Sequence, residues 1–347
     1  MKHTLLLTLL FCLLANLVFG QHTVRYLGGY TVFTIPFEGD SVTFAVVAGK
    51  GELTKKKPIF LFRQGSLPIP LFVINPKNNR PSLTQLPITC YDHETDQYSI
   101  TIAKPGIPLL VDDGYLDTLF STRGNPDMTM YPTQYLQHNY LDYYVRQTNA
   151  VLAFVLKQPW ADPKQVVFAG GSEGYGVAIK TAYTNPAVTH LIAISGFLDG
   201  RMQGQIREER MKGYTGEYTQ AEAQRSVEGL QQLWTAICRD SLNTTAQGGD
   251  PHKTTYSFSH SHNLTYLLSL NIPLLIIYGT ADVGATSNDI LPLEFARRGK
   301  TNLTVKAYPN HDHTFYRLTY GTNGKVVSKE YNSVAVERDY FEWIRTH

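Results

Sequence analysis

The chain has few charged residues for its 347-residue length: they make up 17% of the sequence, and the formal net charge is only +2. This composition does not indicate a basic surface of the kind that binds nucleic acid, so we expect no nucleic-acid partner. The sequence also has no internal repeat and no low-complexity linker. A hydrophobic fraction of 43% favours one globular unit with a large core.

Metal-binding patterns are also sparse. Histidines two positions apart occur at His260 and His262 and again at His311 and His313, but neither pair has the companion ligands of a zinc hydrolase. We therefore expect no metal and no cofactor. A metal-dependent enzyme stays as an alternative, which insensitivity to a chelator would remove.

A long hydrophobic run occurs near the N-terminus, from Thr4 to Phe19 after the basic residue Lys2. The run is short for a membrane span and is followed by Gly20, which suits a secretory signal peptide. We predict cleavage before Gln21, a secreted or periplasmic location, and no membrane anchor in the mature protein.

Cysteine is scarce, and after removal of the leader only Cys90 and Cys238 remain. An oxidising compartment would permit a disulfide between them. Two separate thiols are an equal alternative, because sequence separation says nothing about the short Cα distance that a bridge requires.

The most informative motif that is present lies at 166–178. An apolar run, Val166 to Ala169, predicts a buried parallel strand, and small residues from Gly174 predict a helix that packs closely on the sheet. Ser172 stands in the turn between them, in the pattern G-x-S-x-G. This pattern is typical of the nucleophile elbow, a sharp turn that exposes a serine hydroxyl at the top of a sheet.

Two further polar residues follow strand-like runs downstream. Asp282 comes after the apolar run 271–279, and His313 lies in the loop that follows the run 303–308. Because ligands bind outside the carboxyl ends of the strands in open α/β sheets, we expect Ser172, Asp282 and His313 on one edge of the sheet.

The segments G-G-S-E-G, Y-G-T-A-D and H-D-H-T-F, in the order Ser, Asp, His, resemble the α/β-hydrolase superfamily over most of the mature chain. The resemblance implies a mostly parallel central sheet flanked by helices, with a helical cap insertion. The doubled glycine and the Thr-Phe pair are similar to the dienelactone-hydrolase and prolyl-oligopeptidase-like branches. By the family pattern His313, rather than His311, is the catalytic histidine, and Asp312 is a loop residue.

Chemistry assigns a role to each residue. A serine hydroxyl needs a base, which His313 would supply, while Asp282 would orient the imidazole and stabilise the imidazolium. The oxyanion would bind the backbone N–H of Glu173 and, in the loop after the predicted strand 57–62, that of Ser66. Relatives commonly have His-Gly where this chain has Gln64-Gly65, and a plain turn is the alternative there.

The side chain of Glu173 has two interpretations. As the residue beside the serine it could meet a cationic group of the substrate, or it could point into solvent at the helix N-terminus, where the helix dipole favours it. Only its backbone enters the predicted mechanism.

The remaining pattern predicts a first core segment at 21–195, a cap at 196–263 and a second core segment at 264–347, after a signal peptide at 1–20. We predict strands near 30–47, 98–103 and 190–194, one long helix from about Thr133 to Pro159, a hairpin at 316–327 and a final helix from Ser333.

Within the cap, Thr219 and Glu222 form a capping box ahead of a helix that runs to about Cys238. Its apolar stripe of Leu230, Leu233, Trp234 and Ile237 either lines a substrate pocket or packs within the molecule, and packing is favoured.

The sequence thus predicts a secreted serine hydrolase that cleaves an ester bond in a small-molecule or peptide acyl substrate. A prolyl-oligopeptidase-like peptidase is the first alternative, although such peptidases usually carry a large N-terminal domain for which we expect too few residues here. A non-catalytic binding protein on the same fold is the second.

Overall fold

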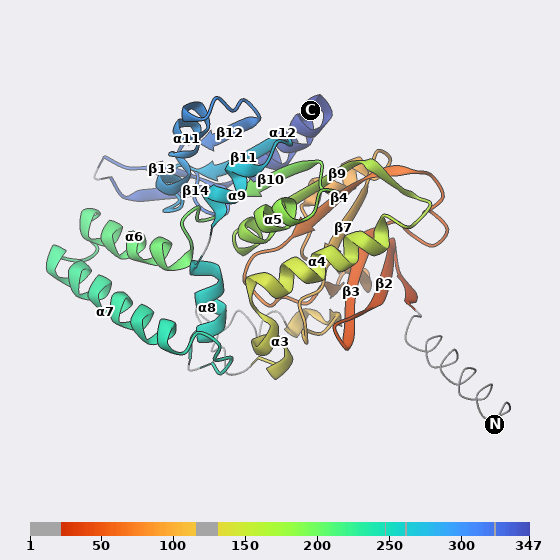
Figure 1. The fold of residues 1–347 in the computed structure, drawn as a ribbon, viewed down its shortest axis with the longest axis horizontal. Coiled ribbons are helices and arrows are strands. Elements are labelled where there is room, and N and C mark those ends of the chain that lie inside the picture. Colours follow the sequence, from red (N-terminus) through yellow and green to blue (C-terminus); the bar gives the residue numbers. More distant parts are fainter. Residues whose placement is uncertain (1–21, 116–130, 247, 261, 323) are drawn as a thin grey trace, which may run out of the picture.

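The computed structural model describes residues 22–115, 131–246, 248–260, 262–322 and 324–347 (Figure 1). The predicted signal peptide, 1–20, lies outside the described residues, as does Asn323 of the predicted hairpin turn. No helix within the described ranges is long and apolar enough to cross a membrane.

A nine-stranded sheet forms the centre of the molecule, in the order β1-β2-β3-β7-β4-β9-β10-β11-β12. The strands from β7 to β12 run parallel, whereas β1, β2, β3 and β7 pair antiparallel. The bounds are β1 Thr23–Leu27, β2 Tyr30–Phe37, β3 Asp40–Val47, β4 Lys57–Arg63, β7 Tyr98–Ile102, β9 Ala161–Gly171, β10 His190–Ile194, β11 Leu274–Gly279 and β12 Leu303–Tyr308.

Two small sheets lie outside the central one. β5 (Phe72–Asn75) pairs with β6 (Arg80–Leu83) and β8 (Leu110–Val111), and the 3-10 turn η1 (Ile88–His93) lies between β6 and β7 in the chain. The predicted hairpin is present as β13 (Tyr316–Tyr320) and β14 (Val326–Tyr331).

Helices cover both faces of the sheet because its central strands are apolar on both sides. All five residues of β10 and all six of β11 are buried. One face packs on α4 (Leu141–Val155), α5 (Glu173–Thr184), α9 (Asn263–Ser269) and α11 (Leu291–Arg297), and the other packs on α12 (Ser333–Thr346). Such continuous apolar strands are typical of parallel sheets buried between helical layers.

The prediction of one long helix from Thr133 was wrong, because the chain forms α3 (Thr133–His138) and then α4. The backbone leaves the helical region at Asn139 and Tyr140, whose ψ angles are 69° and 155°. Tertiary bonds support the break: the Tyr144 hydroxyl donates to Asn139 Oδ1 over 2.7 Å, and the N–H of Leu141 donates to Ser257 Oγ over 3.1 Å. Hydrophobic periodicity does not encode these contacts.

Four helices lie between β10 and β11 in the described chain. α9 packs on the sheet, whereas α6 (Arg201–Tyr214), α7 (Gln220–Arg239) and α8 (His252–Ser259) form a helical insertion. α6 and α7 pack side by side and extend away from the sheet (Figure 1). The capping box that begins α7 is confirmed, with Glu222 N–H donating to Thr219 Oγ1 and Thr219 N–H to the Glu222 carboxylate. Trp234 stacks on Tyr256 of α8 with ring centroids 5.7 Å apart.

Cys90 and Cys238 are free thiols, so the structure does not contain the disulfide that the sequence left open. Cys90 is buried, and Cys238 is exposed.

The close approach of α5 to the end of β4 depends on Gly174, where a Cβ atom would lie 2.2 Å from the carbonyl oxygen of Arg63. We therefore expect Gly174→Ala to lower the free energy of unfolding by about 3 kcal/mol, the upper end of the usual overpacking cost. Gly229, in α7, has no atom within 4 Å of its added Cβ, so Gly229→Ala should stabilise by up to about 1 kcal/mol. Urea unfolding measures both, and equal stability of the two variants would contradict the packing argument.

Candidate active site

Ser172 stands between β9 and α5 with an unusual backbone conformation. Its φ is 55° and its ψ is −115°, and its N–H donates to the carbonyl oxygen of Ile194 over 2.9 Å. A non-glycine residue in such a region costs on the order of 1–3 kcal/mol and persists only where its surroundings hold it. Gly170 allows the turn, because a Cβ there would lie 2.0 Å from the carbonyl oxygen of Gly174. The predicted elbow is therefore present.

Asp282 lies in the turn after β11, at the same edge of the sheet. Its N–H donates to the Gly279 carbonyl oxygen over 3.1 Å, and its Oδ1 accepts the N–H of Gly284 over 3.0 Å. Only 3% of its side chain is exposed. The second carboxylate oxygen is left to face His313.

His313 lies in the loop after β12 and contacts both other residues. Its Nδ1 donates to Asp282 Oδ2 over 2.8 Å, and its Nε2 lies 3.1 Å from Ser172 Oγ. The tautomer follows from the carboxylate, which can only accept a hydrogen bond. The structure thus brings together the three residues that the sequence placed on one edge.

The neighbouring His311 has a different environment. Its ring is buried, with Nδ1 donating to Pro309 O over 2.7 Å and Nε2 accepting from Asn332 Nδ2 over 2.8 Å. Asp312 Oδ1 accepts the N–H groups of Thr314 and Tyr316, each over 3.0 Å. Both residues therefore shape the loop that presents His313.

The loop after β4 approaches Ser172, as predicted. A Cβ atom added to Gly65 would lie 3.2 Å from Ser172 Cβ, so only a glycine fits there without movement of its neighbours. Ser66 follows, and its carbonyl oxygen accepts the Tyr135 hydroxyl over 3.1 Å. The loop is therefore held by side chains as well as by its own backbone.

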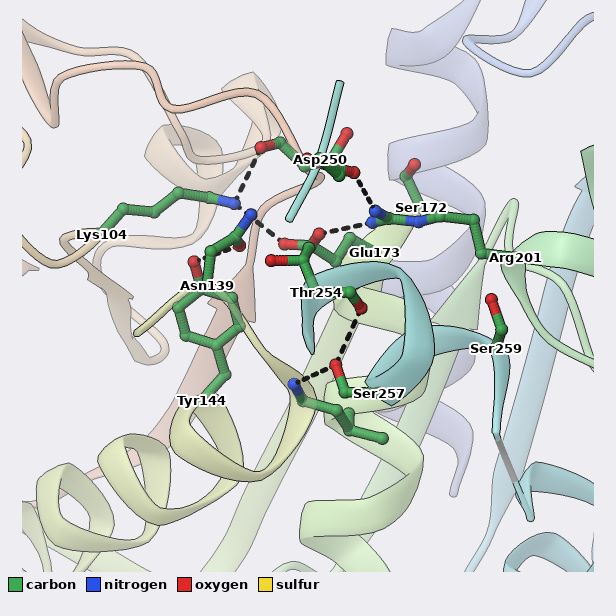
Figure 2. A network of polar contacts seen from close by, with 12 residues as sticks. Lys104, Asn139, Tyr144, Ser172, Glu173, Arg201, Asp250, Thr254, Ser257 and Ser259 are labelled. Atoms are coloured by element: carbon green, nitrogen blue, oxygen red, sulfur yellow. Dashed lines mark hydrogen bonds and ion pairs between the residues drawn. The ribbon is translucent and has the colours of Figure 1, made fainter. Parts of the chain in front are cut away.

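The Glu173 side chain does not point into solvent, so that alternative from the sequence was wrong. Only 2% of it is exposed, and the carboxylate lies between two cations of the same chain (Figure 2). Lys104 Nζ donates to Oε1 over 2.9 Å, and Arg201 donates to Oε2 over 2.6 Å. Arg201 also bonds Asp250. Each Glu173 oxygen therefore already accepts a hydrogen bond from a cation of the protein itself.

The pKa values of His313 and Glu173 are both shifted by their surroundings. Burial alone would lower the pKa of His313, but the hydrogen bond and charge of Asp282, helped by Asp312 and Glu208, raise it above 6.5. Burial would raise the pKa of Glu173, but the charges and hydrogen bonds of Lys104 and Arg201 lower it below 4.5. Glu173 is therefore ionised at neutral pH, and His313 accepts a proton more readily than a free imidazole.

A cavity of about 460 Å³ opens over Ser172, His313 and Asp282. The helical insertion contributes Arg201 and Glu208 from α6 and Phe258 from α8, and no described lining residue comes from α7. The stripe on α7 therefore does not line this pocket. Ile237 is buried and Trp234 stacks on Tyr256, as packing predicts, but Leu233 is exposed. The volume is within the range of small-molecule sites. Among the described residues, no group of three or more His, Cys, Asp or Glu side chains could hold a metal ion.

Lys104, Arg201 and Asp250 escaped the sequence analysis. Lys104 could have been found, because it follows β7, whose carboxyl end lies at the same edge as those of β4 and β9. Arg201 and Asp250 lie in the insertion, where no motif marks them.

The lowered pKa of Glu173 has a consequence for stability. Its ionised form stabilises the folded state above about pH 4.5, and this contribution is lost as the pH falls toward the lower folded pKa. We expect Glu173→Gln to lose about 3 kcal/mol at pH 7, because two buried cations lose a partner, and less at acidic pH. Urea unfolding at pH 7, 5, 4 and 3 measures this, with the exposed Glu217→Gln as control. A difference independent of pH would contradict it.

No protein-family model matches the sequence, and no curated protein sequence matches it. Among solved structures, the chain is similar to an acetyl xylan esterase from Paenibacillus sp. R4, with 13% identity and a TM-score of 0.51 over 94% of this chain and 88% of that one. It is also similar to Acetyl Xylan Esterase 1 from Thermoanaerobacterium sp. JW/SL YS485, with 13% identity and a TM-score of 0.50 over 85% and 83%.

The similar peptidase structures are longer, and this chain matches a smaller share of their length. The chain spans only 38% of the acylaminoacyl peptidase from Pyrococcus horikoshii, at 12% identity and a TM-score of 0.49 over 84% of this chain. Identities this low concern the fold alone. The sheet, the helices on its two faces and the likenesses to the two esterases show that the chain has the α/β-hydrolase fold.

Proposed function

We propose that the protein is a serine hydrolase that cleaves an acyl ester through a covalent intermediate on Ser172. The observation that carries this proposal is the pair of contacts of His313, 3.1 Å to Ser172 Oγ and 2.8 Å to Asp282 Oδ2. A nucleophile, a base and a third group that orients the base form the arrangement that acyl transfer requires.

In the first step, Ser172 Oγ attacks the substrate carbonyl carbon while its proton passes to His313 Nε2. The resulting oxyanion accepts hydrogen bonds from the backbone N–H groups of Glu173 and Ser66. When the intermediate collapses, the bond to the leaving alcohol breaks and His313 returns the proton to the alcohol oxygen. Water then attacks the acyl group by the same route, and Ser172 is regenerated.

Asp282 stays ionised throughout, since it holds the Nδ1 proton of His313 and stabilises the imidazolium. Its burial makes this interaction stronger than it would be in water.

The proposal favours an ester over a peptide bond. Its support is that two similar structures, both named as acetyl xylan esterases, match this chain over more than four fifths of their length. We further propose that the leader at 1–20 exports the enzyme, and that 196–263 acts as the cap over its substrate.

A fluorophosphonate probe tests the nucleophile directly. We expect wild-type protein to gain one adduct by intact mass, and Ser172→Ala and His313→Ala to gain none under the same conditions, because each removes a partner in attack. Ser328→Ala and His262→Ala, which change exposed residues, should label like wild type. Folded wild-type protein without an adduct would rule out the mechanism and favour a binding protein on this fold.

The rate of labelling should depend on pH through His313, because only the neutral imidazole accepts the serine proton. Its raised pKa predicts that the rate rises with pH around a midpoint above 6.5. Glu208→Gln removes one charge that raises this pKa, so the midpoint should fall, whereas Glu209→Gln, whose acid pairs with Lys212, should leave it unchanged. A wild-type midpoint at or below 6.5 would disprove the assigned electrostatics.

A further inference from the structure

Lys104 follows β7 at the edge of the sheet where Ser172 lies, and none of its side chain is exposed. A buried ammonium has lost its hydration and must find other partners for its three N–H donors. Figure 2 shows it directed toward Glu173, on the side of the network opposite Arg201. The proposed mechanism gives this buried ammonium no role.

The ammonium of Lys104 binds both residues that would supply the oxyanion N–H groups. Its Nζ donates to the backbone carbonyl oxygen of Ser66 over 3.0 Å and to Glu173 Oε1 over 2.9 Å. Ser66 belongs to the loop after β4, and Glu173 begins α5, so the two residues lie in separate elements. One side chain thus connects the two halves of the site.

We propose that Lys104 is a positioning residue that fixes the spacing and orientation of the oxyanion N–H groups of Ser66 and Glu173. The proposal rests on the proposed function, since it concerns the same reaction. Oxyanion donors stabilise charge only when they lie about 2.7–3.1 Å from the developing oxygen, so a small displacement of either donor reduces the rate.

The surroundings of Lys104 support a positioning role. The Tyr135 hydroxyl donates to the same Ser66 carbonyl oxygen over 3.1 Å, which fixes the loop from a second direction. The rings of Tyr144 and Tyr135 lie 5.2 Å and 5.7 Å from Nζ and favour its charge. On the other side of Glu173, Arg201 of α6 binds Oε2 over 2.6 Å. The Glu173 carboxylate is therefore held from both the core and the insertion.

Stability alone is a weak reason for this pair. Replacing a buried ion pair by apolar residues of similar volume is often neutral or stabilising, because desolvation offsets the attraction. A buried pair beside Ser172 can instead fix the orientation of the groups around it, since a hydrogen-bonded ammonium determines where each of its acceptors lies. A purely structural pair would affect folding and leave the chemistry of the folded fraction unchanged.

The test measures the chemistry of folded protein. Lys104→Met removes both hydrogen bonds but leaves Glu173 with only Arg201, and it could fail to fold. The double variant Lys104→Met with Glu173→Gln also removes the Glu173 carboxylate, so no buried negative charge is left without Lys104. Lys56→Met, at a lysine whose side chain is 57% exposed, is the matched control. Far-UV circular dichroism and thermal unfolding establish which variants are folded.

Hydrolysis of p-nitrophenyl acetate then separates kcat from KM, and a trifluoromethyl ketone reports binding of the tetrahedral form. We expect the folded variants to lose about 10- to 100-fold in kcat with KM within twofold of wild type. The affinity for the ketone should fall by a similar factor, while Lys56→Met matches wild type.

Folded Lys104 variants with wild-type kcat and ketone affinity would overturn the proposal, as would a loss carried by KM alone. Failure of the proposed function gives a different result, because wild-type protein would then form no adduct with a fluorophosphonate. Wild-type labelling together with unchanged Lys104 variants therefore contradicts only the role of Lys104.

Discussion

The backbone conformation of Ser172 is the constraint on which the rest of the site depends. Ser172, with a φ of 55°, is the one residue between β9 and α5. The absence of side chains at Gly170 and Gly174 allows the strand and the helix to approach each other closely. This turn directs the hydroxyl toward His313 and leaves the N–H of Glu173 at the start of a helix, where partial positive charge gathers. The packing that holds the strained turn therefore also places both the proposed nucleophile and one of the proposed oxyanion donors.

The same turn has an electrostatic consequence, because it buries the Glu173 carboxylate. Burial of an unpaired carboxylate is costly, so the fold must supply cations, and it does so from two sides with Lys104 and Arg201. Lys104 comes from the edge of the sheet and Arg201 from the first helix of the insertion. Arg201 thereby connects the insertion to the residue beside Ser172. The position of α6, which lines the cavity, therefore depends on the position of Glu173.

Much of this arrangement could be predicted from the sequence, because Ser172, Asp282 and His313 each follow an apolar strand and parallel strands end on one edge. Their order along the chain and the turn residues around them can be read directly from the sequence. The orientation of the Glu173 side chain could not be predicted, since Arg201 and Lys104 lie 28 and 69 positions away. The break between α3 and α4 was missed for the same reason: side chains distant in sequence stabilise it.

In the proposed mechanism Ser172 carries the acyl group during turnover, and peptide mapping of an acid-quenched reaction shows which residue holds that group. A hindered ester such as p-nitrophenyl trimethylacetate should acylate the enzyme faster than water removes the acyl group. We expect the added trimethylacetyl mass on the peptide that contains Ser172 and on no other peptide. Release of p-nitrophenolate with the acyl group on another residue, or on none, would contradict it.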